Sequence, residues 1–165
     1  MKVIDNFLNK DRYNHLKEVM FSDGVPWFLK QGTVDGKKED LTWFSHCFYN
    51  ENKPDSNLYS FMPDFLNKLN VASLLQIRAN LSLTPPTDKF KTNAHIDYPY
   101  TNSKTAIFYF NTDTSGTIFY NKKEELIKAK ENRMVVFNTN IKHCGYLTNK
   151  SNKRIVINFN YYEKN

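Results

Sequence analysis

The sequence predicts a single domain that is mainly β, with helices flanking the sheets. The chain has 165 residues and a mass of 19.5 kDa, which is the size of one domain. From about residue 73 to residue 162 it contains short runs that alternate apolar and polar residues or are rich in β-branched and aromatic residues. The part from about residue 1 to residue 72 shows helical spacing instead. Many short strands with tight turns indicate a sandwich, jelly roll or barrel, with the helices against one outer face.

Two helices are expected in the first part of the chain. Asp11 can cap the first one, which should end at Asp23-Gly24 because Pro26 cannot continue a helix. The apolar pattern of the second helix runs from about Leu58 to Leu69. Pro63 interrupts this pattern, so we expect the helix itself to start near Pro63. The apolar residues of the first helix recur at three- and four-residue spacing: Tyr13, Leu16, Val19 and Met20.

Strands dominate the second part of the chain. The turn at residues 113–116 separates two of them, and residues 124–130 are expected to form a short helix or a loop. The expected strands are residues 75–81, 105–110, 117–120, 134–137 and 154–162.

Composition excludes some classes of protein. The N-terminus has no apolar signal segment and no apolar run approaches the length of a membrane span, so a cytoplasmic protein without a membrane partner is expected. Two cysteines, Cys47 and Cys144, are too few for a disulfide framework. The net charge is +6, but the lysines are scattered, so a nucleic-acid partner is neither indicated nor excluded.

The tripeptide His95-Ile96-Asp97 is the first candidate for a metal site. In a strand, residues two apart point to the same side, so both side chains can reach one ion. A motif this short occurs easily by chance, and it needs a third ligand. Two histidines and one carboxylate on one face of an octahedron leave positions for O2 and a cosubstrate.

His143 is the candidate for the third ligand. It follows the expected strand 134–137 after a short polar turn, although His143 alone is better explained as a surface-loop residue. Arg154 begins the final strand, whose alternate residues Arg154, Val156, Asn158 and Asn160 give one polar face. An arginine there can hold a carboxylate through two parallel hydrogen bonds.

These segments together resemble the prolyl 4-hydroxylase-like branch of the 2-oxoglutarate/Fe(II)-dependent dioxygenases. Across the whole chain the resemblance is to small phage-encoded oxygenases of this type, which would place the protein in a host cytoplasm. The matching pieces are residues 95–97, 105–111, 116–119, 132–137, His143 and residues 154–158. The resemblance implies a double-stranded β-helix, or jelly roll, supported by N-terminal helices.

The resemblance also implies roles for individual residues. It makes His95, Asp97 and His143 the ligands of Fe(II), and Arg154 the partner of the distal carboxylate of 2-oxoglutarate. Tyr109 matches a tyrosine that bonds the same carboxylate, and Asn158 matches a position that lines the cosubstrate pocket. Asn80 and Arg78 fall on the polar face of the strand before the iron motif, where they are expected to approach the cosubstrate or the substrate. Residues 85–87 stand where the family often has a tyrosine before its first iron ligand, which leaves the substrate side of the pocket open.

The implied activity is hydroxylation coupled to oxidative decarboxylation of 2-oxoglutarate by O2, with ascorbate as a reagent that can keep the iron reduced. Asp97 favours hydroxylation over halogenation, because a small residue there would open a site for halide. The substrate stays open: a peptidyl proline, another peptide residue, a small molecule or a nucleobase. The alternative is a non-catalytic cupin-like jelly-roll module that binds a metal or a ligand, and the sequence does not indicate an oligomeric state.

Overall fold

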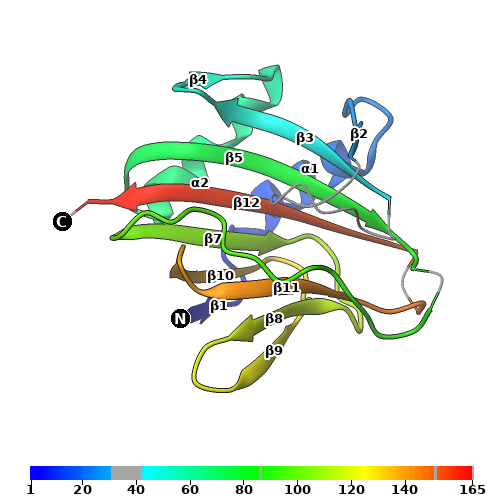
Figure 1. Ribbon diagram of the computed structural model, residues 1–165. Helices are drawn as coiled ribbons and strands as arrows, with labels where there is room; N and C mark the ends of the chain where they lie inside the picture. Colours follow the sequence, from blue (N-terminus) through cyan, green and yellow to red (C-terminus); the bar gives the residue numbers. More distant parts are fainter. Residues whose placement is uncertain (31–41, 86, 151, 165) are drawn as a thin grey trace.

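The computed structural model describes residues 1–30, 42–85, 87–150 and 152–164, and it has two β-sheets packed face to face (Figure 1). In the described residues the larger sheet has eight strands, in the order β1-β10-β7-β12-β5-β3-β2 with β4 paired to β3. The smaller sheet has four strands, in the order β6-β11-β8-β9. This confirms the expected mainly β fold, a double-stranded β-helix with flanking helices.

Each sheet collects strands from distant parts of the sequence. The larger sheet contains β1 (Lys2–Ile4), β2 (Phe28–Lys30), β3 (Trp43–Asn50), β4 (Lys53–Pro54), β5 (Val71–Leu83), β7 (Ser103–Tyr109), β10 (Arg133–Asn138) and β12 (Lys153–Glu163). The smaller sheet contains β6 (Phe90–Lys91), β8 (Gly116–Tyr120), β9 (Glu124–Lys128) and β11 (Lys142–Leu147). The helical elements are α1 (Lys10–Phe21), the 3₁₀ turn η1 (Asn57–Phe61) and α2 (Pro63–Lys68).

The alternation of side chains along β7 and β12 divides the interior into two layers. Phe108 of β7 and Ile157 of β12 lie on the outer face of the larger sheet, where they pack against α1 and α2. Tyr109 and Val156 lie on the inner face and pack against Phe119 of the smaller sheet. The inner layer also holds the polar residues discussed below, so the helices stabilise one face of the sheet and leave the other for a site.

The helices begin close to where the sequence placed them. The side chain of Asn9, not Asp11, caps α1 by accepting a hydrogen bond from the backbone N–H of Arg12. Asp11 therefore lies within the first turn, where its charge still suits the positive end of the helix dipole. The second expected helix is split: a 3₁₀ turn precedes α2, which begins at Pro63.

Three segments differ from expectation. Residues 124–128 form strand β9, not a helix or a loop, because they pair along β8. The part before residue 73 is not only helical, since β1 pairs with β10 and β3 pairs with β5. His143 lies within strand β11 and not on a surface loop. In all three cases pairing with another strand decides the local structure.

None of the helices in the described part of the chain has the length and apolar character needed to cross a membrane.

At Gly116, the first residue of β8, the backbones of β8 and β9 lie too close together for a side chain. A Cβ atom at this position would lie 2.2 Å from the backbone oxygen of Ile127, whereas one at Gly24 would meet only the Ser22 hydroxyl oxygen, at 3.4 Å. We expect Gly116→Ala to lower the free energy of unfolding by about 1–3 kcal/mol, because the backbone must shift. Gly24→Ala is the control and should change it by less than about 1 kcal/mol. Equal denaturant midpoints for the two variants would contradict this packing.

Candidate metal and cosubstrate site

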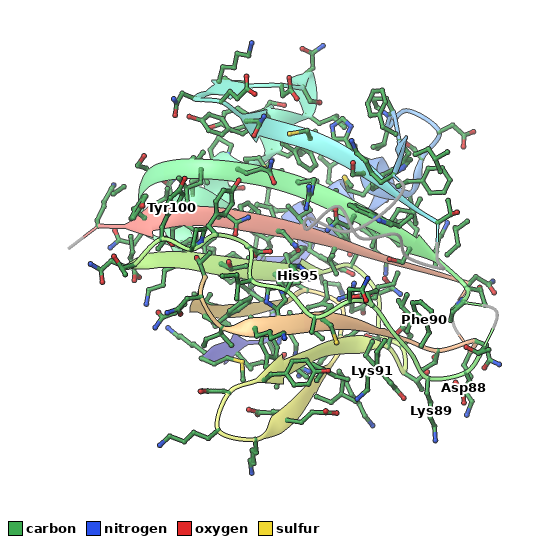
Figure 2. All side chains as sticks on the ribbon, in the orientation of Figure 1. Asp88, Lys89, Phe90, Lys91, His95 and Tyr100 are labelled. Carbon is green, nitrogen blue, oxygen red and sulfur yellow. The ribbon has the colours of Figure 1, made fainter. Side chains whose placement is uncertain are left out.

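A cavity opens between the inner faces of the two sheets. Its empty space is about 750 Å³ when the open solvent at its mouth is included. Figure 2 shows Asp88 and Tyr100 at opposite ends of the sandwich, with His95 between them on the segment that crosses its middle. The cavity is lined by Trp43, Arg78, Asn80, Ser82, Thr92, His95, Ile107, Thr117, His143, Gly145, Leu147, Arg154, Val156 and Asn158.

A short β-bridge joins the two histidines of the cavity. The backbone N–H of His95 donates to the oxygen of His143, and the N–H of His143 donates to the oxygen of His95, both at 2.9 Å. The bridge sets the two imidazole rings side by side, with their centroids 4.8 Å apart. His95 lies in this isolated bridge and not in a regular strand, so the expected strand around the tripeptide is reduced to a single paired residue.

Asp97 completes a compact group of three possible ligands. Its Oδ1 atom lies 3.6 Å from His95 Nε2 and 3.8 Å from His143 Nε2. One ligand atom from each residue lies within 4.8 Å of the others, which is close enough to hold one metal ion. Asp97 Oδ2 lies 2.9 Å from the Thr105 hydroxyl, which shares its one hydrogen between Asp97 and Asn160 Oδ1, and Asp97 Oδ1 faces the imidazoles.

Backbone carbonyls orient both imidazole rings. His143 Nδ1 lies 3.0 Å from the oxygen of Ile141, and His95 Nδ1 lies 3.0 Å from the oxygen of Asn93. A carbonyl oxygen can only accept, so each Nδ1 carries the hydrogen and each Nε2 presents a lone pair toward Asp97. This is the tautomer that a metal-binding histidine requires.

The ionisation of the group also suits a cation. Burial lowers the pKa of His143 below its ordinary value, which favours the neutral, ligating form. Burial alone would raise the pKa of Asp97, but its contacts with His95 and His143 outweigh this and lower it, so the carboxylate stays charged. The donor set is two imidazole nitrogens and one carboxylate oxygen, which fits a divalent iron site with open positions.

A second polar group lies at another part of the same cavity. Arg154, on β12, is almost fully buried and donates from Nη2 to the hydroxyl oxygen of Thr117 at 3.0 Å. The Tyr109 hydroxyl donates to the same oxygen at 2.7 Å, and the guanidinium carbon of Arg154 lies 5.4 Å from the centroid of the Tyr109 ring. Thr117 accepts both bonds, which leaves its own hydroxyl hydrogen available to a ligand.

The buried guanidinium has unused hydrogen-bonding capacity. Arg154 Nε is buried and has no hydrogen-bond partner among the described residues, and no ion pair of Arg154 occurs there. An unpaired buried cation is costly, so this position suits an incoming anion. The cavity therefore contains a possible metal group and a separate carboxylate-binding group.

The asparagines expected near the cosubstrate also face the cavity. Asn80, on β5, and Asn158, on β12, line it, and the Oδ1 atom of each is buried without a partner in the described residues. Asn160, at the next inward position of β12, lies with its Oδ1 2.8 Å from the Thr105 hydroxyl. The polar face expected on the last strand is thus the wall of the cavity.

Sequence reasoning missed two polar residues of the site, Thr117 in the cavity lining and Thr105 beside Asp97. Thr105 and Thr117 are threonines in strands, where their strand preference hides a polar role. Trp43 also lines the cavity, from β3. The alternation of β7 could have identified Thr105, because it shares a face with Tyr109.

The other two histidines lie away from the cavity. His46 is buried on β3, with Nδ1 2.9 Å from the oxygen of Pro26 and Nε2 2.9 Å from the hydroxyl oxygen of Ser56. The His15 ring, on α1, packs against Phe61. Both histidines therefore contribute to packing and hydrogen bonding outside the cavity.

No family model and no curated protein matches this sequence. The fold is nevertheless similar to that of solved structures at low sequence identity. An oxidoreductase of the 2OG-Fe(II) oxygenase family from Burkholderia pseudomallei superimposes with a TM-score of 0.71 at 8% identity, covering 99% of this chain and 85% of that one. A prolyl hydroxylase from Trichoplax adhaerens, solved with a peptide of the hypoxia inducible factor oxygen degradation domain, gives 0.65 at 14% identity, covering 98% and 83%.

A third similar structure was solved with an iron ion and alpha ketoglutarate. The epimerase SnoN, solved with Fe3+, alpha ketoglutarate and nogalamycin RO, gives a TM-score of 0.64 at 8% identity, covering 98% of this chain and 78% of that one. At these identities the comparisons establish a common fold. The chemistry of this chain must therefore be argued from its own residues.

Thr105→Val tests whether the hydroxyl of Thr105 holds Asp97 in place for a metal. We expect the dissociation constant for a divalent metal ion to rise about 10- to 100-fold, because such supporting bonds orient a ligand. Anaerobic calorimetry with Fe(II) measures it, and Thr105→Ser, which keeps the hydroxyl, is the control. A folded Thr105→Val protein with unchanged affinity would show that the bond to Asp97 is not needed.

Proposed function

We propose that this protein is an iron(II)- and 2-oxoglutarate-dependent dioxygenase that hydroxylates its substrate. The observation that carries the proposal is the presence, in one cavity, of the His95, Asp97 and His143 group and of the buried, unpaired Arg154. The first suits iron and the second suits the distal carboxylate of the cosubstrate. Neither group alone would distinguish an oxygenase from a binding module.

His95, Asp97 and His143 would hold the iron through Nε2, a carboxylate oxygen and Nε2. Bound there, iron supplies the activation of O2 and the coupling of 2-oxoglutarate decarboxylation to substrate oxidation. The protein contributes orientation: Thr105 fixes the carboxylate, and the backbone carbonyls of Asn93 and Ile141 fix the rings. Asp97 favours hydroxylation, because it occupies the position that a halide would need.

Arg154 would bind the distal carboxylate of 2-oxoglutarate through its guanidinium nitrogens. The Thr117 hydroxyl would donate to the same carboxylate, because its oxygen already accepts from Arg154 and from the Tyr109 hydroxyl. Burial raises the pKa of Tyr109, so this hydroxyl stays protonated and remains a donor. Asn80 and Asn158 line the cavity, and their amide N–H groups are the atoms that could donate to oxygens in the middle of the cosubstrate.

The substrate, the cellular location and the origin of the protein are proposed on grounds other than the shared fold. The substrate class includes peptidyl prolines, other peptide residues, small molecules and nucleobases. Two of the similar structures were solved with a peptide fragment and with nogalamycin RO, respectively. A cytoplasmic location, a phage origin and a need for ascorbate to keep the iron reduced belong to the same proposal.

A non-catalytic jelly-roll module is the alternative function. Such a module would bind a metal or a ligand without needing a partner for a cosubstrate carboxylate. The buried guanidinium of Arg154 argues against it, because an arginine there is costly unless an anion joins it.

The direct test is the formation of succinate from 2-oxoglutarate by the purified protein with Fe(II), O2 and ascorbate. Uncoupled turnover should be measurable without the substrate and should vanish in Asp97→Ala. Succinate formation that is independent of added Fe(II), or that persists in Asp97→Ala, would sink the proposal.

Arg154→Gln tests the cosubstrate site separately from the metal site. We expect the dissociation constant of 2-oxoglutarate to rise about 100-fold, because charge-assisted hydrogen bonds to the carboxylate are lost. Fe(II) affinity should stay unchanged. Arg12→Gln, which removes an exposed arginine paired with Asp64, is the matched control and should affect neither. Equal 2-oxoglutarate affinities in both variants would reject the role of Arg154.

Tyr109→Phe tests the support beneath the carboxylate. The variant loses one buried hydroxyl that bonds to Thr117, so we expect 2-oxoglutarate to bind about 5- to 20-fold more weakly. Tyr161→Phe is the control, because Tyr161 is equally buried but lies on the helical side of the sheet. Calorimetry should separate the two variants, and a loss of affinity in Tyr161→Phe of the same size would assign the effect to general loosening.

A further inference from the structure

Arg78 is a second arginine in the cavity, and the proposed function does not use it. It lies on β5, where it pairs in register with Asn158 of β12, and its side chain lines the cavity. The guanidinium carbon lies 5.6 Å from the centroid of the Trp43 ring. The aromatic face holds the cation in a defined place without neutralising its charge.

Arg78 has no anionic partner in the described part of the chain. Its Nε atom is buried and makes no hydrogen bond, and none of the ion pairs among the described residues includes it. Among the described residues that line the cavity there is no aspartate or glutamate that could balance it, and Asp97 is turned toward the two histidines. A half-buried guanidinium of this kind suits a ligand carboxylate.

The position of Arg78 separates it from the cosubstrate group at Arg154. Arg154 lies opposite Ser82 in the register of β12 and β5, and Arg78 lies four residues further along β5. At about 3.3 Å per residue, the Cα atoms of the two arginines are offset by roughly 13 Å along the strand direction. A 2-oxoglutarate molecule held between Arg154 and the iron would therefore leave Arg78 free for another molecule.

A balance of charges points the same way. The two charges of Fe(II) and the single charge of Arg154 would be balanced by Asp97 and the two carboxylates of 2-oxoglutarate. Arg78 then adds one positive charge to a partly enclosed cavity, where uncompensated charge is unfavourable. A carboxylate of the substrate would pair with this charge, whereas a substrate without a carboxylate would leave Arg78 unpaired.

We propose that Arg78 binds a carboxylate of the molecule that is oxidised, so that the substrate is a small carboxylic acid, such as a free amino acid, and not an internal peptide residue. This inference rests on the proposed function. Arg78 would be a substrate-binding residue, with Trp43 as the flat wall on which its guanidinium is held.

The test compares carboxylates with their neutral amides on the protein loaded anaerobically with Fe(II) and 2-oxoglutarate. The probes are the twenty proteinogenic amino acids and acetate, each beside its amide, with inorganic phosphate as a further anion. Trp43 reports binding in a Trp27→Phe background, where it is the only tryptophan. We expect at least one carboxylate to bind ten times more tightly than its amide and to change the emission of Trp43.

Two variants locate the effect. Arg78→Gln should remove the preference for the carboxylate, whereas Arg78→Lys, which keeps the charge, should retain part of it. Both should bind 2-oxoglutarate as the wild type does, in contrast to Arg154→Gln. The comparison of acid with amide needs only the background protein, so it stands even if a variant at Arg78 does not fold.

The outcomes distinguish this proposal from the proposed function. If no carboxylate is preferred to its amide, or if phosphate binds more tightly than every carboxylate, the proposal about Arg78 is wrong. The proposal about Arg78 is also wrong if Arg78→Gln weakens the binding of 2-oxoglutarate as strongly as Arg154→Gln does. Arg78 would then belong to the cosubstrate site. A wild-type protein that does not bind 2-oxoglutarate would instead refute the proposed function.

Discussion

The paired backbone hydrogen bonds between His95 and His143 decide whether this molecule has a site at all. They fasten the segment after β6 to β11 and set the two imidazole rings together. A slip of one residue in this pairing would turn one ring to the opposite face, because successive side chains of an extended chain alternate. The metal group is therefore a consequence of strand register.

The same alternation explains why one sheet can serve both packing and chemistry. On β12, Ile155 and Ile157 face the helices, while Arg154 and Asn158 face the cavity. The apolar layer provides the stability, so the inner layer can contain buried polar atoms that lack partners within the chain. These atoms are costly without a ligand, which favours a ligand-binding role for the cavity over a packing defect.

The sequence predicted those parts of the site that carry local patterns. His95 and Asp97 stand two residues apart, and Arg154 opens an alternating strand, so their common location could be inferred. Strand β11 could not be predicted from its own residues, which include a glycine and have no clean alternation. Strand β9 was misjudged because Glu, Leu and Lys are good helix formers, and pairing with β8 overrides that preference. The contact of Thr105 with Asp97 depends on tertiary folding and leaves no local signal.

The most direct measurement of the central claim is an absorption spectrum of the protein with Fe(II) and 2-oxoglutarate under anaerobic conditions. If His95, Asp97 and His143 hold iron next to a cosubstrate anchored by Arg154, a weak visible metal-to-ligand charge-transfer band should appear only when both are present. The band should be lost in Asp97→Ala. Its absence from metal-loaded wild-type protein, or its persistence in Asp97→Ala, would contradict the account.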